Sequence, residues 1–133
     1  MTTLIDKIAL VHIVEGRVLA ARSTGKDTYY LPGGKREIGE TDEETLVREI
    51  QEELSVHIKS ETISPLGTFE AGAHGKAEGV TVRMTCYSAA FEGELAAASE
   101  IEELAWLTYS DRDRVSAVSQ LIFDKLHALK QLF

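Results

Sequence analysis

The chain has 133 residues and carries 22 acidic against 14 basic side chains, which gives a formal net charge of -8 at pH 7. This length predicts one domain over residues 1–133 with a substantial core. The acidic balance argues against a nucleic-acid polymer or an anionic membrane as the main partner. A single cysteine, Cys86, excludes an internal disulfide framework and a cysteine zinc site. No apolar run is long enough for a membrane span and no signal-peptide pattern is present, so we expect a cytoplasmic protein.

The N-terminal part of the chain predicts a β-hairpin. Aliphatic and β-branched residues fill positions 4–14 and 18–22, on either side of a turn that contains glycine. His12 lies inside the first of these strands, where a packed histidine is expected rather than a ligand. Arg22 ends the second strand, and its position is equally consistent with a contact to substrate phosphate and with a plain surface charge.

A glycine-rich turn then leads into an acidic helix. Gly33 and Gly34 allow the backbone to approach a ligand closely, and Thr41 with Glu44 forms the capping box that begins a helix ending near Leu54. At helical spacing the apolar stripe comprises Val47, Ile50 and Leu54, and the opposite face carries Glu49, Glu52 and Glu53.

Three carboxylates on one helix face repel one another by a few tenths of a kcal/mol for each pair. A divalent cation relieves that repulsion, and magnesium typically binds one or two carboxylates together with phosphate oxygens and water. The sequence therefore indicates a metal-bridged phosphate site, with a solvated acidic face as the alternative.

The full spacing of this segment is more specific than the carboxylates alone. Gly34 is followed after five residues by Glu40 and after seven more by Arg48-Glu49, an apolar residue, any residue, and Glu52-Glu53. This pattern resembles the Nudix box, here residues 34–56. The one departure is Ser55, which stands where the family has glycine just past the helix, a position that favours a left-handed backbone.

The resemblance implies an α/β (α+β) fold, the Nudix-type α/β/α sandwich with a mixed sheet and a loop-helix-loop active-site motif. It implies a MutT-like hydrolase that uses Mg²⁺, with Mn²⁺ as an alternative. The implied metal ligands are the carbonyl of Gly33 and the carboxylates of Glu49, Glu52 and Glu53. The implied catalytic residues are Arg48, Glu49, Glu53 and an acid before the tryptophan-bearing strand, with Glu100 the first choice and Glu102 the second. Family members differ in the general base, and here we favour Glu49.

The remaining segments supply the weaker candidates. Residues 63–70 and 80–91 predict strands, and the apolar face of the second places Cys86 in the core. The intervening loop, 71–79, either reaches the substrate or faces solvent. From Ser110 onward a helix is expected, capped by Ser110 or Asp111 and packed on the sheet, with a dimer surface as its less favoured use. The substrate-binding candidates are Arg22, Glu40, His74, Lys76 and Arg83.

These features predict hydrolysis of a phosphoanhydride bond, either in a nucleoside diphosphate linked to another group or in a nucleoside triphosphate. The expected partner is a small nucleotide, and the protein is expected to be a monomer or a homodimer. Two alternatives stay open. An isoprenoid-diphosphate isomerase of the same fold needs a cysteine near the site, and a noncatalytic nucleotide sensor would bind without turnover.

Overall fold

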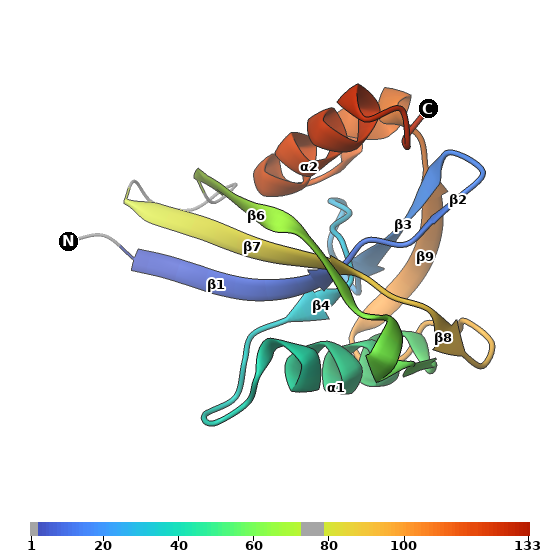
Figure 1. Cartoon of the computed structure of the whole chain (residues 1–133). Helices are drawn as coiled ribbons and strands as arrows, with labels where there is room; N and C mark the ends of the chain where they lie inside the picture. Colours follow the sequence, from blue (N-terminus) through green and yellow to red (C-terminus); the bar gives the residue numbers. More distant parts are fainter. Residues whose placement is uncertain (1–2, 73–78) are drawn as a thin grey trace.

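The computed structural model describes residues 3–72 and 79–133. Figure 1 shows the arrangement of its helices and strands. In chain order they are β1 (Thr3–Leu10), β2 (Ile13–Val14), β3 (Arg17–Ser23), β4 (Gly33–Gly34), α1 (Asp42–Leu54), β5 (His57–Ile58), the 3-10 helix η1 (Ser60–Thr62), β6 (Ser64–Gly72), β7 (Val80–Ser88), β8 (Phe91–Glu92), β9 (Ile101–Leu107), the 3-10 helix η2 (Tyr109–Arg114) and α2 (Ala117–Ala128).

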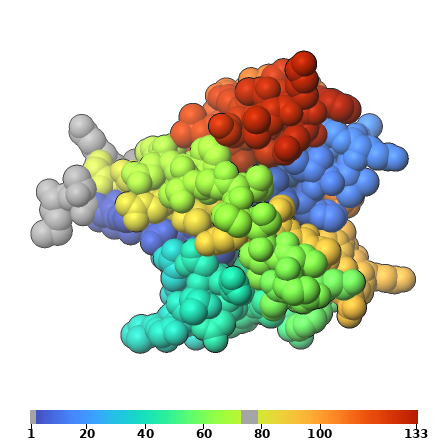
Figure 2. All heavy atoms as spheres, viewed as in Figure 1, coloured from blue at the N-terminus to red at the C-terminus, as the bar shows by residue number. Residues whose placement is uncertain are grey.

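A mixed sheet separates two helical layers. Its strand order is β4-β1-β7-β6, with β1 and β7 parallel and the other neighbours antiparallel. Strands β2, β3 and β9 form a second sheet, and β5 pairs with β8. The helices α1 and α2 lie on opposite sides of the strands (Figures 1 and 2). The core is accordingly divided into one cluster that includes Phe123 of α2 and another that includes Leu46 and Ile50 of α1. The expected α/β/α arrangement is confirmed.

The N-terminal hairpin is present but shorter than predicted. Strands β2 and β3 pair as expected, whereas the long first strand is interrupted at Val11 and His12. The N–H of Val11 donates to the Tyr87 carbonyl in β7, while the His12 carbonyl accepts from Leu19 in β3. The chain therefore passes from the mixed sheet to the second sheet at this point. The His12 ring packs against Phe91, with centroids 4.7 Å apart, which agrees with the expected packed histidine.

The helix α1 is as the sequence predicts. Thr41 is its N-cap, and the reciprocal bonds of the capping box to Glu44 are both present. Ser55 follows the helix with φ of 65°, in the left-handed region that favours glycine. Its hydroxyl donates to the carbonyl of Ala96 at 3.2 Å. The departure from the family pattern therefore falls on a position with a left-handed backbone, which the sequence had indicated.

The C-terminal helix begins later than predicted. The expected start at Ser110 or Asp111 is wrong, because both residues lie in the separate 3-10 helix η2, whose N-cap Thr108 donates its N–H to the Asp111 carboxylate. Val115 then adopts an extended backbone and bridges to Tyr29. The helix α2 begins only after Ser116. A tertiary contact therefore interrupts a pattern that reads as continuous helix in sequence. Neither α1 nor α2 has the length and apolar character needed to cross a membrane, and the described residues contain no other α-helix.

Cys86 is fully buried in the cluster beneath α2, as its strand pattern predicted. Burial raises the pKa of its thiol to about 12. Since the thiolate is the nucleophile, we expect the native protein to react with Ellman's reagent at pH 8 about 10³-fold more slowly than the unfolded protein. Absorbance at 412 nm in buffer and in denaturant measures both rates. Comparable rates in the two conditions would contradict the burial of this side chain.

Candidate active site

Two glycines at the edge of the mixed sheet let carboxylates of α1 reach the opposite face. Strand β4 consists only of Gly33 and Gly34, which pair with Ala9 and Ile8 of β1. A Cβ on Gly34 would lie 2.6 Å from Oε1 of Glu49, and a Cβ on Gly33 would overlap the backbone of β1. A side chain at Gly34 would therefore push Glu49 of α1 away from the strand, and a side chain at Gly33 would separate β4 from β1.

Beyond these glycines lies a cavity of about 1020 Å³, which we call the acidic cavity. Its wall includes Gly33 with Glu49 and Glu53 of α1, and Glu100 from the loop before β9. Glu53 is only 3% exposed, and its Oε1 accepts a hydrogen bond of 3.1 Å from the Gly33 N–H. Four glutamates were predicted as catalytic or metal-binding residues, and three of them, Glu49, Glu53 and Glu100, therefore lie around one cavity.

The acidic cavity raises the pKa of two of its carboxyl groups. Burial raises the pKa of Glu53 to about 8; the charges of Glu49 and Glu100 also raise it, and the Gly33 N–H opposes them. Burial likewise raises the pKa of Glu49, against the effect of Arg48. The Ser99 hydroxyl, by contrast, lowers the pKa of Glu100. Such a cluster of carboxyl groups holds negative charge at an energetic cost, which a proton or a cation relieves.

Arg48 joins the loop before α1 to the acidic cavity. Its Nε and Nη2 donate to the two oxygens of Glu40 at 2.7 and 2.9 Å, and its Nη1 donates to Oε1 of Glu49 at 2.8 Å. A further bond of 3.0 Å reaches the carbonyl of Lys35. The hydrogen bonds from Arg48 lower the pKa of Glu40 to about 2. The ion pair expected of Arg48 is thus present, and Glu40 holds the loop rather than facing the cavity.

Glu52 does not share this arrangement. It is exposed on the outer side of α1, where it lines a separate hollow of about 680 Å³, and its Oε2 lies 3.9 Å from Nη1 of Arg48. Of the three glutamates predicted on one face of α1, Glu49 and Glu53 line the acidic cavity, whereas Glu52 does not, although its charge raises the pKa of Glu49. Within residues 3–72 and 79–133, no three His, Cys, Asp or Glu side chains converge as they stand into a group that could hold a metal.

The predicted substrate-binding residues lie mostly elsewhere. Arg22 donates to Glu102 at 2.6 Å and to the Lys26 carbonyl at 2.9 Å. Neither Arg22 nor Glu102 lines the acidic cavity. Arg83 is paired with Glu70 at 2.9 Å, and strand alternation places it on the face opposite Val82 and Met84. The candidates His74 and Lys76 lie outside the described residues.

The cavity wall also contains residues that were not anticipated from the sequence, among them Lys7 and Tyr30. Lys7 of β1 lies with its Nζ 5.9 Å from the centre of the Tyr30 ring, and both residues line the acidic cavity. The Tyr30 hydroxyl shares a hydrogen bond of 2.5 Å with the Ser23 hydroxyl. The alternation of β1 could have grouped Lys7 with Ile5, but it could not show which face of the strand adjoins the cavity.

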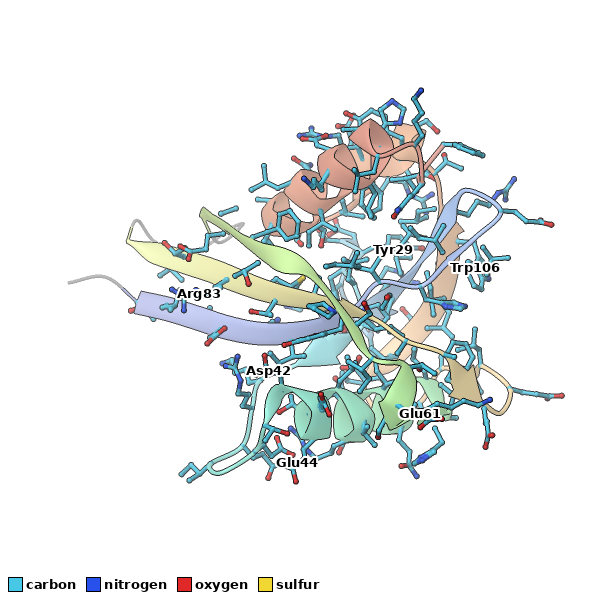
Figure 3. All side chains as sticks on the ribbon, in the orientation of Figure 1. Tyr29, Asp42, Glu44, Glu61, Arg83 and Trp106 are labelled. Atoms are coloured by element: carbon cyan, nitrogen blue, oxygen red, sulfur yellow. The ribbon has the colours of Figure 1, made fainter. Side chains whose placement is uncertain are left out.

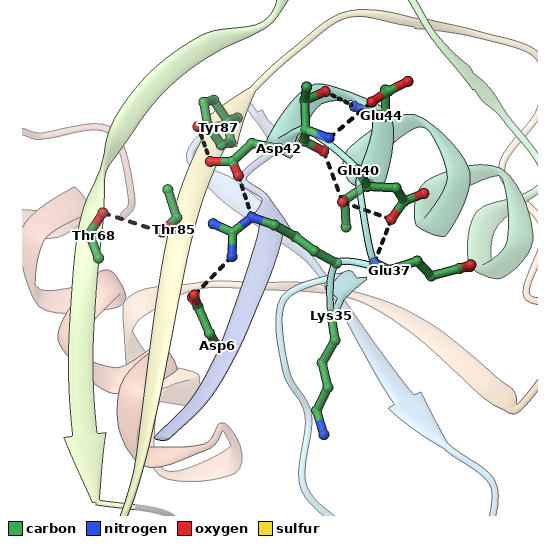
Figure 4. Close-up of polar contacts among 12 residues, drawn as sticks. Asp6, Lys35, Glu37, Glu40, Asp42, Glu44, Thr68, Thr85 and Tyr87 are labelled. Atoms are coloured by element: carbon green, nitrogen blue, oxygen red, sulfur yellow. Dashed lines mark hydrogen bonds and ion pairs between the residues drawn. The ribbon is translucent and has the colours of Figure 1, made fainter. Parts of the chain in front are cut away.

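An arginine outside the conserved spacing of the motif fixes the loop from the other side. Arg36 binds both Asp6 of β1 and Asp42, the first residue of α1, two residues that are labelled in Figure 4. Its Nη1 donates to Asp6 at 2.8 Å and its Nε donates to Asp42 at 2.5 Å, while Tyr87 donates to Asp42 at 2.6 Å. The loop is therefore held by Arg36 against the sheet and by Arg48 against the helix.

Replacing Arg36 with methionine should lower the free energy of unfolding by about 1–2 kcal/mol, because two partly buried ion pairs are lost and two carboxylates are left together. Urea unfolding of Arg36→Met, Asp42→Asn and the double variant measures the coupling. The matched control is Arg83→Met. It removes a single ion pair that is more exposed than those of Arg36, and it should lower the free energy of unfolding by less than about 0.5 kcal/mol. Equal losses in the two arginine variants would show that Arg36 does not fix the loop.

Comparison with known proteins agrees with this geometry. Similar solved structures include a MutT NUDIX hydrolase from Burkholderia pseudomallei (TM-score 0.72, 23% identity, 93% of this chain and 98% of that chain). The ORF135 protein of E. coli is also similar (TM-score 0.71, 22% identity, 97% and 92%), as is the MutT protein of Methanosarcina mazei Go1 (TM-score 0.73, 17% identity, 97% and 96%). At these identities the likeness shows the fold alone. No curated protein matches the chain.

The family follows from the sequence match to a domain model. The model described as the NUDIX domain matches residues 6–124, which include most of the mixed sheet, the loop held by Arg36 and Arg48, and the helix α1 with its glutamates. This match covers most of the chain and contains the motif at residues 34–56 that first indicated the family. The chain therefore belongs to the NUDIX domain family, and its fold is that of the Nudix hydrolases.

Proposed function

We propose that the protein is a divalent-metal-dependent hydrolase that cleaves a phosphoanhydride bond by attack of water on phosphorus. The substrate class is a nucleoside diphosphate linked to another group, or a nucleoside triphosphate. One observation carries the proposal: Glu49, Glu53 and Glu100 line a single cavity whose rim also carries the cationic side chains of Lys26 and Lys35. Carboxylates and cations at one site suit a metal-bound polyphosphate.

The residues of the acidic cavity fit a hard divalent cation. Glu53 is a buried carboxyl group next to two further carboxyl groups, and every side-chain donor of this set is oxygen. We propose that Mg²⁺, or Mn²⁺ in its place, is held by the Gly33 carbonyl together with Glu49 and Glu53. Glu52, although exposed, is retained as a proposed ligand. A bound ion of this kind polarises a phosphate and lowers the pKa of bound water.

The chain itself positions the carboxylates and accepts a proton. Arg48 donates to Oε1 of Glu49 and so orients the carboxylate that accepts the proton of the attacking water. Burial raises the pKa of Glu49, which favours its role as a base near neutral pH. Gly33 orients Glu53 through its N–H. We therefore propose Glu49 as general base, with Glu100 as the alternative.

The two competing functions gain no support from the described residues. An isomerase needs a cysteine at the site, whereas Cys86 is buried in the core and does not line the acidic cavity. A nucleotide sensor has less need of several carboxylates around one cavity. Neither is adopted here as a second function.

Release of phosphate or pyrophosphate from a substrate panel tests the proposal directly. The panel comprises nucleoside triphosphates, oxidised triphosphates, nucleotide sugars, ADP-ribose and dinucleoside polyphosphates, each with Mg²⁺ and with chelator. Metal-dependent hydrolysis of any member is the expected result and identifies the substrate. Tight binding of a member that survives intact would instead favour the sensor.

A further inference from the structure

Five cationic side chains of described residues line the acidic cavity, although the protein as a whole is acidic. Two of them are arginines that fix the loop before α1: Arg36 binds Asp6 and Asp42, and Arg48 binds chiefly Glu40 and Glu49. Their guanidinium groups serve the loop that they hold. The three remaining cations are lysines, namely Lys7, Lys26 and Lys35.

Lys7 differs from the other two lysines in the rigidity of its backbone. It lies within β1, where it pairs in register with Met84 of β7, whereas Lys26 and Lys35 lie outside regular secondary structure. Its side chain is half-buried, and its Nζ lies 5.9 Å from the centre of the Tyr30 ring. A contact of this kind favours a fixed position for an ammonium group. Lys7 is therefore a preorganised charge.

The position of Lys7 relative to the carboxylates suggests what it contacts. Ile8 and Leu10 of β1 pack in the cluster beneath α1, so strand alternation directs Lys7 to the other face, toward α2. The carboxylates of α1 reach this same face past Gly33 and Gly34. The positive charge of Lys7 also lowers the pKa of Glu53, which places the ammonium group near this carboxyl group.

We propose that Lys7 is a substrate-binding residue that anchors a phosphate group of the substrate from the floor of the acidic cavity. This assignment rests on the proposed function, because it takes the ligand to be a polyphosphate. An ammonium group binds phosphate as a compact point charge. With the carboxylates of α1 and Lys7 of β1 in its wall, the cavity presents both signs of charge that a metal-bound diphosphate needs.

Binding of inorganic pyrophosphate in the presence of Mg²⁺, measured by calorimetry, tests the assignment without any need for turnover. Lys7→Met should weaken binding about tenfold, as expected for loss of one charged hydrogen bond. Lys7→Arg should retain affinity within about threefold because it keeps the charge. The matched control is Lys59→Met, which removes a lysine paired with Glu92 at 3.7 Å and absent from the cavity wall; its affinity should equal that of the unsubstituted protein.

Two results would overturn the assignment. One is pyrophosphate affinity that is unchanged in a folded Lys7→Met variant, with folding confirmed by circular dichroism and by protection of the Cys86 thiol. The other is weaker binding of phosphate-free nucleosides alone, which would mean that Lys7 contacts the base. Failure of the proposed function is a separate outcome. Pyrophosphate binding that depends on Lys7, without hydrolysis of any panel substrate, would support Lys7 as a phosphate-binding residue and contradict the proposed hydrolase activity.

Discussion

Glu53→Gln is expected to lower turnover by about 10³-fold, the range typical of a lost acid, base or metal-bound group. Glutamine keeps the shape of the side chain and an oxygen that can accept the bond from Gly33, which is 3.1 Å in the present structure. It removes the negative charge that the proposal assigns to metal binding. Steady-state kinetics with the panel substrate found to be hydrolysed measure the effect.

The same variant should not be destabilised. Glu53 is 3% exposed and lies beside Glu49 and Glu100, so its ionised form is costly to bury. A neutral amide avoids that cost, and we expect a melting temperature equal to or above that of the unsubstituted protein. Loss of activity with retained or raised stability is the signature of a residue selected for function.

Glu61→Gln is the matched control, because it makes the same chemical change on the exposed 3-10 helix η1 (Figure 3). It should leave both turnover and melting temperature unchanged. Near-normal turnover of Glu53→Gln would remove Glu53 from the proposed metal site. A similar loss in both variants would point to an effect of net charge instead.

Removal of divalent ions is the second change with a large expected effect. Chelator should lower hydrolysis by about 10³-fold or more, since metal polarisation of a phosphate lowers the activation barrier by several kcal/mol. Excess Mg²⁺ should restore the rate. The release of phosphate or pyrophosphate before chelation, after it and after restoration provides the measurement.

Circular dichroism and protection of the Cys86 thiol serve as controls for unfolding in chelator. Both should be unchanged, because the core clusters beneath α1 and α2 are formed by apolar side chains. A rate that resists chelation in the folded protein would exclude the proposed mechanism. Unfolding in chelator would instead show that the ion also supports the structure.

The local features of this protein could be predicted well from its sequence. The capping box of Thr41 and Glu44 and the left-handed backbone at Ser55 depend on residues within one helical turn. The burial of Cys86 followed from the alternation of a single strand. Each of these features is indicated by neighbouring positions in the sequence, so its prediction does not depend on contacts with distant segments.

The predictions that failed depended on partners distant in the chain. The break at Val11 and His12 arises because β1 pairs with β7 while β2 pairs with β3. The late start of α2 arises from the bridge between Val115 and Tyr29. Periodicity reports the face of a strand or helix, but it does not identify the element that covers that face.

By itself the sequence determined the family, the glycine turn, the capped helix and the carboxylates that the helix carries, because these features depend on fixed spacing between neighbouring positions. Only the tertiary structure decided which of those carboxylates share a cavity. The edge strand of two glycines buries Glu53 and leaves Glu52 exposed. The tertiary structure also brings Lys7 and Glu100, more than ninety positions apart in the sequence, to one cavity. Sheet pairing and loop packing join such distant residues, and no pattern of neighbouring residues indicates which ones will meet.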